Sequence, residues 1–155
     1  GILPIAKNEA GIAAIMGHEV AHALANHGQQ RMSAGMIQQG VGAGVAIATK
    51  DKSKSEQDIW MQAFAVGSSV GGMLPFSRSH ETEADEIGLY LTAIAGYNPD
   101  EASLLWERMK ENSKEKSPPE FLSTHPSNDS RIVNLRTLSN KAKQEARKFG
   151  VTTFR

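Results

Sequence analysis

The chain has 155 residues, which is enough for one domain with a buried core. Its 17 basic and 17 acidic residues cancel, and this argues against nucleic acid as the main partner, because nucleic-acid-binding proteins usually present a basic face. It contains no cysteine, so a thiolate zinc site and a disulfide framework are both excluded. The lack of cysteine does not indicate in which cellular compartment the protein is located.

The first predicted element is a helix from Glu9 to about Arg31. Asn8 is a typical N-cap residue, and Glu9 places an acidic side chain in the first turn. Apolar residues then recur at helical spacing, and no proline interrupts the segment. Three glycines weaken the helix locally, so we expect packing to stabilise it.

This helix carries the motif His18-Glu19-Val20-Ala21-His22. Histidines four residues apart lie on one helix face, at the spacing that two imidazole ligands of a zinc ion require. Glu19 projects about 100° away from His18, so it flanks the metal and can accept a proton from a zinc-activated water. This is the HExxH pattern of metalloproteases. The alternative is a pair of ordinary histidines.

A Gly-rich helical hairpin is predicted over residues 33–76, with a charged loop at residues 50–58. Each arm contains two small residues four apart, which allow close helix packing: Gly40 with Gly44, and Gly67 with Gly71. Neither arm is a convincing membrane span, since about 20 strongly apolar residues are needed. The alternatives are a tight soluble hairpin, which the sequence favours, and an element that touches a membrane.

Two helices are predicted next. The first begins at Ser77 or Ser79 and runs to about Ala95, with Gly96 as its C-terminal stop. The second begins at Asn98-Pro99-Asp100, which combines a capping side chain with proline at the first helical position. Its core-facing stripe has the i, i+3, i+4, i+7 pattern: Ala102, Leu105, Trp106 and Met109.

The rest of the chain is predicted to be a loop over residues 110–120 and a final helix opened by Ser127. Ile132, Leu135 and Leu138 face inward in that helix. Only residues 151–154 have strand character. We therefore expect a mainly α domain of about five helices.

A catalytic zinc site takes three protein ligands and water, so a third ligand is needed. Glu81 and Asp85 share a helix face beside a buried stripe, which places a carboxylate within reach of a metal held by a neighbouring helix. A solvated acidic helix start is the alternative, and spacing alone does not choose between them. His27 lies about 140° round the helix from His22 and is predicted to be a helix-end residue, whereas His80 faces away from Glu81 and is predicted to be structural.

The combination of His18-Glu19-x-x-His22 with the later segment Ser77-Arg78-x-x-Glu81-x-x-Ala84-Asp85 resembles the HtpX and CAAX prenyl protease type of zinc metallopeptidase. The resemblance is greatest to the soluble or membrane-attached cell-envelope branch and the related mitochondrial inner-membrane protease. The segments 96–99, 106–109 and 121–131 resemble that branch too, so the similarity covers about residues 3–138.

The resemblance implies His18, His22 and Glu81 as ligands of one zinc ion per chain, with Glu19 as general base. It also suggests Asp85 as an assisting acid or as a residue that orients a ligand histidine. It implies a zincin-like helical domain, residues 1–155, with the hairpin 33–76 inserted between zinc ligands. The family's small sheet precedes the HExxH helix, and we expect this chain to lack most of it.

Two further residues have alternative roles. His125, which precedes Pro126, can donate to the oxyanion, occupy the open zinc position at rest, or simply cap the final helix. Arg78 can brace Glu81 or form a surface salt bridge.

The predicted function is a zinc metalloendopeptidase that cleaves extended or misfolded polypeptides in a bacterial cell envelope, as in protein quality control. The alternative is a zinc-containing, chaperone-like binding module with little proteolytic activity. The expected partners are polypeptide substrates, and a peripheral membrane contact through the hairpin is the less favoured alternative to a soluble hairpin. Oligomeric state does not follow from the sequence.

Overall fold

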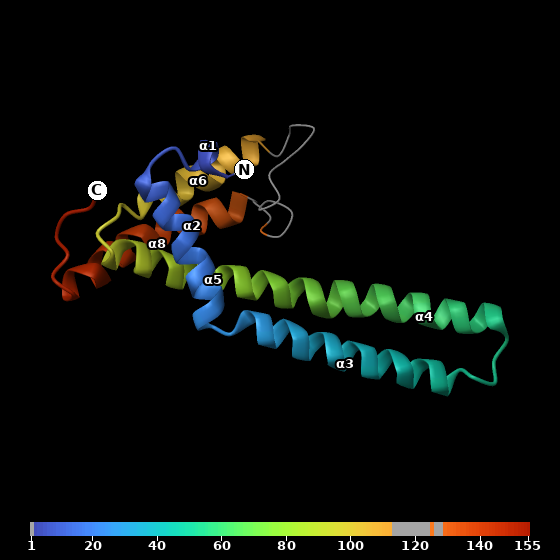
Figure 1. Ribbon diagram of the computed structural model, residues 1–155. Helices are drawn as coiled ribbons and strands as arrows, with labels where there is room; N and C mark the ends of the chain where they lie inside the picture. Colours follow the sequence, from blue (N-terminus) through green and yellow to red (C-terminus); the bar gives the residue numbers. More distant parts are fainter. Residues whose placement is uncertain (1, 113–124, 126–128) are drawn as a thin grey trace. The chain divides into compact units, whose positions relative to one another are not determined.

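The computed structural model describes residues 2–112, 125 and 129–155, and these residues are mainly helical, as predicted (Figure 1). No strand occurs among them, so residues 151–154 do not form the strand that their composition favours. The elements in chain order are α1 (Leu3–Ala6), α2 (Glu9–Leu24), α3 (His27–Ala48), α4 (Lys54–Ser68), a π-helical segment (Ser69–Met73), α5 (Leu74–Ile94), α6 (Asp100–Asn112) and α8 (Asp129–Lys148).

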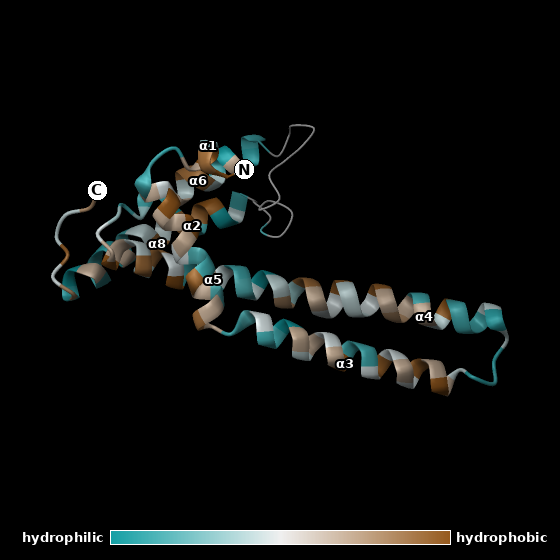
Figure 2. Cartoon of the chain, viewed as in Figure 1, coloured by the Kyte–Doolittle hydropathy of each residue, from teal (hydrophilic) through white to brown (hydrophobic). Residues whose placement is uncertain are grey.

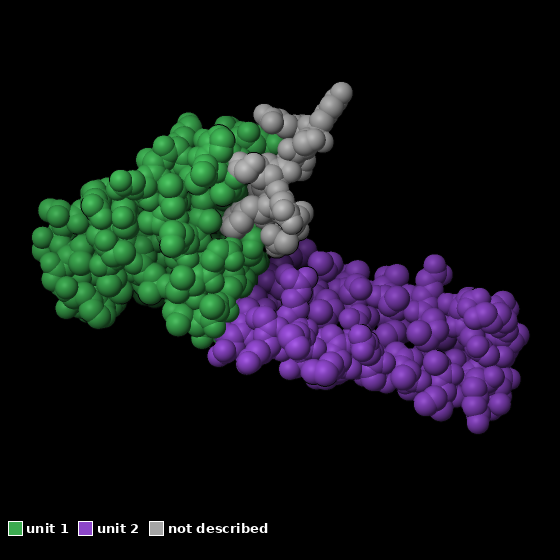
Figure 3. Space-filling model, viewed as in Figure 1, with its two compact units in different colours: residues 1–25, 81–155 green, residues 26–80 purple. Residues whose placement is uncertain are grey.

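The chain divides into two compact units, coloured separately in Figure 3. Unit 1 comprises residues 1–25 and 81–155, and unit 2 comprises residues 26–80. Unit 2 therefore contains the whole of the predicted hairpin 33–76. That the chain behaves as a single domain stays a prediction.

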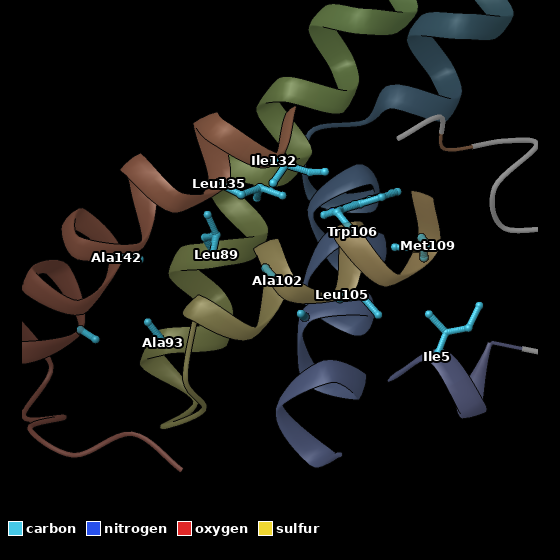
Figure 4. Packing of buried hydrophobic residues seen from close by; sticks show 12 residues of the cluster. Ile5, Leu89, Ala93, Ala102, Leu105, Trp106, Met109, Ile132, Leu135 and Ala142 are labelled. Atoms are coloured by element: carbon cyan, nitrogen blue, oxygen red, sulfur yellow. The ribbon is translucent and has the colours of Figure 1, made fainter. Parts of the chain in front are cut away.

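The core of unit 1 is formed by side chains from α2, α5, α6 and α8, with Ile5 of α1 at its edge (Figure 4). The predicted stripe of α6 is confirmed, because all four of its members are buried: Ala102, Leu105, Trp106 and Met109. Ile132 and Leu135 of α8 are buried against the same cluster, and Leu138 packs at its margin. Ser127, the predicted start of the last helix, lies outside the described residues.

The boundary between α5 and α6 agrees with the sequence. Gly96 adopts φ 82°, the left-handed conformation that ends helices and that glycine adopts without strain. The side chain of Asn98 then accepts a hydrogen bond from the backbone N–H of Asp100 at 3.2 Å, so the predicted capping residue opens α6.

The helix predicted from Glu9 to Arg31 is too long. The structure ends α2 at Leu24 and begins α3 at His27. Between them Asn26 adopts φ 56°, a left-handed conformation that asparagine tolerates better than most residues. The break was missed because no glycine or proline marks it.

The predicted break before Ser77 or Ser79 is also wrong. Residues from Lys54 to Ile94 are helical throughout, with one π-helical segment in the middle. The charged loop predicted over residues 50–58 is shorter in the structure, because α4 already begins at Lys54. Ser53 and Glu56 form a capping box there, in which each side chain accepts a hydrogen bond from the other residue's backbone N–H.

Unit 2 is a two-helix hairpin that buries little of its own surface. Gln38 of α3 donates to the Ser68 hydroxyl at 2.8 Å, and the ring of Phe64 covers Gly42. Apolar residues are scattered along both helices in Figure 2, and many are exposed. Within the described part of the chain, no helix combines the length and the apolarity that crossing a membrane requires.

The helices α2 and α5 approach closely at a pair of glycines in unit 1. A Cβ atom added to Gly17 would lie 2.7 Å from the carbonyl oxygen of Gly88, and one added to Gly88 would lie 2.9 Å from the backbone nitrogen of His18. Both neighbours are backbone atoms, so they cannot rotate away. This contact brings His18 on α2 beside the turn of α5 that carries Asp85.

Substitution Gly88→Ala is therefore expected to destabilise the protein by about 1–3 kcal/mol, because overpacking outweighs the gain in helix propensity. Urea unfolding of the metal-free protein measures this. Gly35→Ala in α3 is the matched control: a Cβ there meets no atom within 4 Å, so stability should hold or rise. Equal stability of Gly88→Ala and the unchanged protein would contradict the close contact.

Candidate metal centre

Four side chains of unit 1 gather where α2 meets the start of the unit-1 part of α5. They are His18, His22, Glu81 and His125, each of which offers one ligand atom within 4.8 Å of the others. His18 and His22 come from consecutive turns of α2, as their spacing predicts. Glu81 comes from α5, more than 50 residues further along the chain. The candidate third ligand of the sequence is thus brought to the histidine pair.

The spacing of these atoms fits a small tetrahedral ion. His18 Nε2 lies 3.0 Å from His22 Nε2 and 3.4 Å from Glu81 Oε2. His22 Nε2 lies 3.3 Å from Glu81 Oε1. Zinc bound at about 2.0–2.1 Å requires donor atoms about 3.3–3.4 Å apart, the edge of a tetrahedron. Imidazole nitrogens and a carboxylate oxygen are also ligands that zinc prefers. The residues present therefore fit a zinc ion.

Asp85 contacts the ring nitrogen of His18 that is not in the ligand group. Its Oδ1 lies 3.0 Å from His18 Nδ1, on the opposite side of the imidazole from Nε2. A carboxylate in this position fixes the proton on Nδ1 and leaves Nε2 free to bind a metal. Of the two roles suggested for Asp85, this geometry favours orientation of a ligand histidine over that of an assisting acid.

Arg131 of α8 is a site residue to which the sequence assigned no role. Its Nε and Nη2 bond both oxygens of Asp85 at 2.6 and 2.7 Å, and its Nη1 lies 2.9 Å from Glu81 Oε2. The side chain is only 7% exposed, and the guanidinium stacks 3.6 Å above the ring of Trp106. Arg131 thus compensates two buried carboxylates at once, which a lysine point charge would not do with the same geometry.

These contacts shift two protonation equilibria in the metal-free site. Burial alone would raise the pKa of Glu81, but hydrogen bonds from the three histidines and the Arg131 charge hold that pKa far below its usual range. Burial alone would lower the pKa of His18, but hydrogen bonds to Asp85 and Glu81 outweigh it and raise that pKa. Glu81 is therefore held as an anion that can bind a cation, and the raised pKa of His18 means that protons compete with a metal for its imidazole up to a higher pH than for an ordinary histidine.

His125 and Glu19 lie on the same side of the group. Nδ1 of His125 is 3.1 Å from His18 Nε2 and 3.0 Å from Glu81 Oε2. Its other nitrogen, Nε2, is 3.3 Å from Glu19 Oε1. Glu19 is half exposed and is not one of the four grouped donors, which agrees with a residue that flanks the metal without binding it. His125 is therefore part of the site rather than only a helix cap.

The two remaining histidines lie apart from this group. His27 and His80 are buried in unit 2, with their rings stacked 4.0 Å apart, which supports a structural role for His80. His27 is the first residue of α3, so it lies at a helix end as predicted. The role of Arg78 stays a prediction. Arg131 is a cation that contacts Glu81, and the sequence signal that could have found it is a basic residue on the buried stripe of α8.

Comparison with known proteins identifies the family to which the sequence is similar. Residues 1–139 match the model of Peptidase family M48. The mitochondrial metalloendopeptidase OMA1 of Schizosaccharomyces pombe is 39% identical over 136 residues, which cover 87% of this chain and 38% of that protein. OMA1 of Saccharomyces cerevisiae is 35% identical, over 92% of this chain and 40% of that protein. The beta-barrel assembly-enhancing protease of Escherichia coli K12 is 28% identical, over 86% of this chain and 28% of that protein.

No solved structure matches the chain. The chain spans about two fifths of the length of the two yeast relatives. The predicted similarity to metallopeptidases is nevertheless confirmed, because the match to Peptidase family M48 covers residues 1–139 and both yeast relatives are named metalloendopeptidases. With the family model covering residues 1–139, the chain belongs to peptidase family M48.

Proposed function

We propose that the protein is a zinc-dependent metalloendopeptidase with His18, His22 and Glu81 as the zinc ligands and Glu19 as the general base. The observation that carries the proposal is the spacing of the candidate ligand atoms beside the Glu19 carboxylate, which is not one of the grouped donors. His18 Nε2 and His22 Nε2 lie 3.0 Å apart, and each lies 3.3–3.4 Å from one of the two oxygens of Glu81. A zinc ion in this site supplies Lewis acidity, which lowers the pKa of water and polarises a peptide carbonyl.

The chain's own residues supply the proton transfers and the orientation. Glu19 takes the proton from the attacking water and passes it to the nitrogen of the leaving amine. Asp85 and Arg131 hold His18 in its orientation through the contacts described above. Nε2 of His125, 3.3 Å from Glu19, is placed to donate toward the carbonyl oxygen as negative charge develops there.

The proposed substrates are extended or misfolded polypeptides, and the proposed location is a bacterial cell envelope. The name of the Escherichia coli relative supports an envelope setting, whereas the yeast relatives are named mitochondrial. Assignment to the HtpX-like or envelope branch of the family is part of the same proposal.

Removal of the metal tests the proposed function. A chelator is expected to abolish cleavage of an unfolded protein such as reduced casein, and one equivalent of zinc should restore it, because the donors fit a single ion. Zinc content measured by mass spectrometry on the same samples should follow activity. As a control, magnesium added after the chelator should not restore cleavage. Full cleavage by protein that contains no metal would contradict the proposal.

A second candidate function is a zinc-binding module with little proteolysis. It is favoured by His125 Nδ1, which lies within 3.1 Å of both His18 Nε2 and a Glu81 oxygen and so can complete four protein ligands. His125→Ala separates the two. If His125 closes the site, its removal raises peptide hydrolysis from a low level. If it donates to the oxyanion, its removal lowers the rate of an active enzyme by about 10²–10³-fold.

A further inference from the structure

The base of the hairpin holds a pair of buried histidines that the proposed chemistry does not use. His27 is the first residue of α3, and His80 lies in α5. Their rings are parallel to within 9° with centroids 4.0 Å apart, and the residues are 4% and 8% exposed. Gln30 Oε1 lies 3.0 Å from His80 Nε2, and because an amide oxygen can only accept, the proton is on that nitrogen.

This pair is not a second metal site. Two ligand histidines must aim their nitrogen lone pairs at one point, but parallel stacked rings present faces to each other. Among the described residues, the one group of histidines and acids able to hold an ion contains neither His27 nor His80. The ring of Phe76 packs on His80 as well, with centroids 4.1 Å apart. The contact is therefore a packed aromatic cluster with its polar atom satisfied.

The position of the pair in the sequence gives the contact its importance. His27 follows His22 by five residues, and His80 immediately precedes Glu81. The stack therefore joins a residue five positions after the proposed ligand His22 to the residue immediately before the proposed ligand Glu81. The segment 28–79 leaves and returns between these two points.

We propose that His27 and His80 form a clamp that positions Glu81 for zinc. This inference rests on the proposed function for the identity of the ligands. Without the clamp, Glu81 is connected to His22 only through a long insertion and the packing of unit 1, and long insertions leave their ends weakly restrained. With it, residues 27 and 80 at the two ends of the insertion are held in contact with each other. His27 and His80 are positioning residues, since neither is among the grouped donors.

The clamp also explains why the hairpin can be long and little buried without loosening the site. Motion of the distal loop at residues 49–53 is not transmitted to Glu81 if the base is held by a buried contact. The stacked rings are buried, and the hydrogen bond that His80 Nε2 donates to Gln30 Oε1 fixes the rotation of one of them.

Zinc affinity of ring-deletion variants tests the clamp. His27→Ala and His80→Ala are each expected to raise the zinc dissociation constant about tenfold, as loss of a ligand-orienting partner does. The Kd is measured by chelator competition, with circular dichroism to check folding. kcat should fall while KM for peptide stays constant, because the metal geometry changes and the substrate contacts do not. The variants His27→Phe and His80→Phe keep a flat ring and should restore both values.

Phe64→Ala is the matched control, since it removes an aromatic contact with Gly42 in the same hairpin but away from its base. It should leave the zinc Kd unchanged. Folded His27→Ala and His80→Ala proteins that bind zinc as tightly as the unchanged protein would overturn the clamp, as would an equal loss in Phe64→Ala. If the unchanged protein binds zinc but cleaves no peptide, the proposed peptidase function is refuted. The clamp is then tested by the zinc dissociation constants of the alanine variants, compared with that of the unchanged protein. No zinc binding at all would overturn both.

Discussion

Glu19→Gln is expected to reduce peptide hydrolysis by at least about 10²–10⁴-fold while the protein keeps one zinc ion per chain. Glutamine has the size and polarity of glutamate but cannot accept a proton at neutral pH. Glu19 is also outside the group of candidate ligands, so its replacement should not weaken the metal site. Steady-state cleavage of a fluorogenic peptide, with zinc content determined on the same sample, measures both effects.

Glu9→Gln is the control for this prediction. Glu9 is an exposed glutamate on the same helix, in its first turn, so the variant makes the same chemical change away from the site. It should keep full activity. A zinc-loaded Glu19→Gln protein whose rate is within about tenfold of the original would remove the general-base assignment.

Arg131→Met is expected to destabilise the metal-free protein by about 3–5 kcal/mol, because it leaves two buried carboxylates without their partner. Asp85 loses two charge-assisted hydrogen bonds, and Glu81 loses its contact with Nη1. Methionine keeps an apolar side chain of similar length but removes the guanidinium that stacks on Trp106, so the loss reports on the charge and on its stacking contact. Urea unfolding in the presence of a chelator gives the free-energy difference.

Arg136→Met provides the comparison on the same helix. Arg136 pairs with Glu107 at the surface, where more than half of the arginine side chain is exposed. Such a pair contributes about 0–1 kcal/mol. If Arg131→Met costs no more than Arg136→Met, the buried pairing does not hold the site together.

The parts of the site that the sequence predicted are those determined by local geometry. His18, Glu19 and His22 lie on one helix, so their spacing alone places the two histidines on one face. The core stripe of α6 was predicted for the same reason. Glu81 was different, because spacing left it undecided between a ligand and a solvated helix start. It was chosen from a resemblance, and the structure places it beside the histidines.

Most features of the site that the sequence did not predict depend on contacts between distant segments of the chain. The crossing at Gly17 and Gly88 sets how α2 meets α5, and glycine alone does not predict which helices will touch. Arg131 is 46 residues from Asp85, and no local pattern links them. The helix break at Asn26 was missed because asparagine is compatible with both a helix and a left-handed turn.

Anomalous diffraction at the zinc edge, from crystals of the zinc-loaded protein, tests the central claim most directly. We expect a single strong peak about 2.0–2.2 Å from His18 Nε2, His22 Nε2 and one Glu81 oxygen, with Glu19 close by and not bound. No peak at these side chains, or a peak whose carboxylate ligand is a residue other than Glu81, would contradict the account.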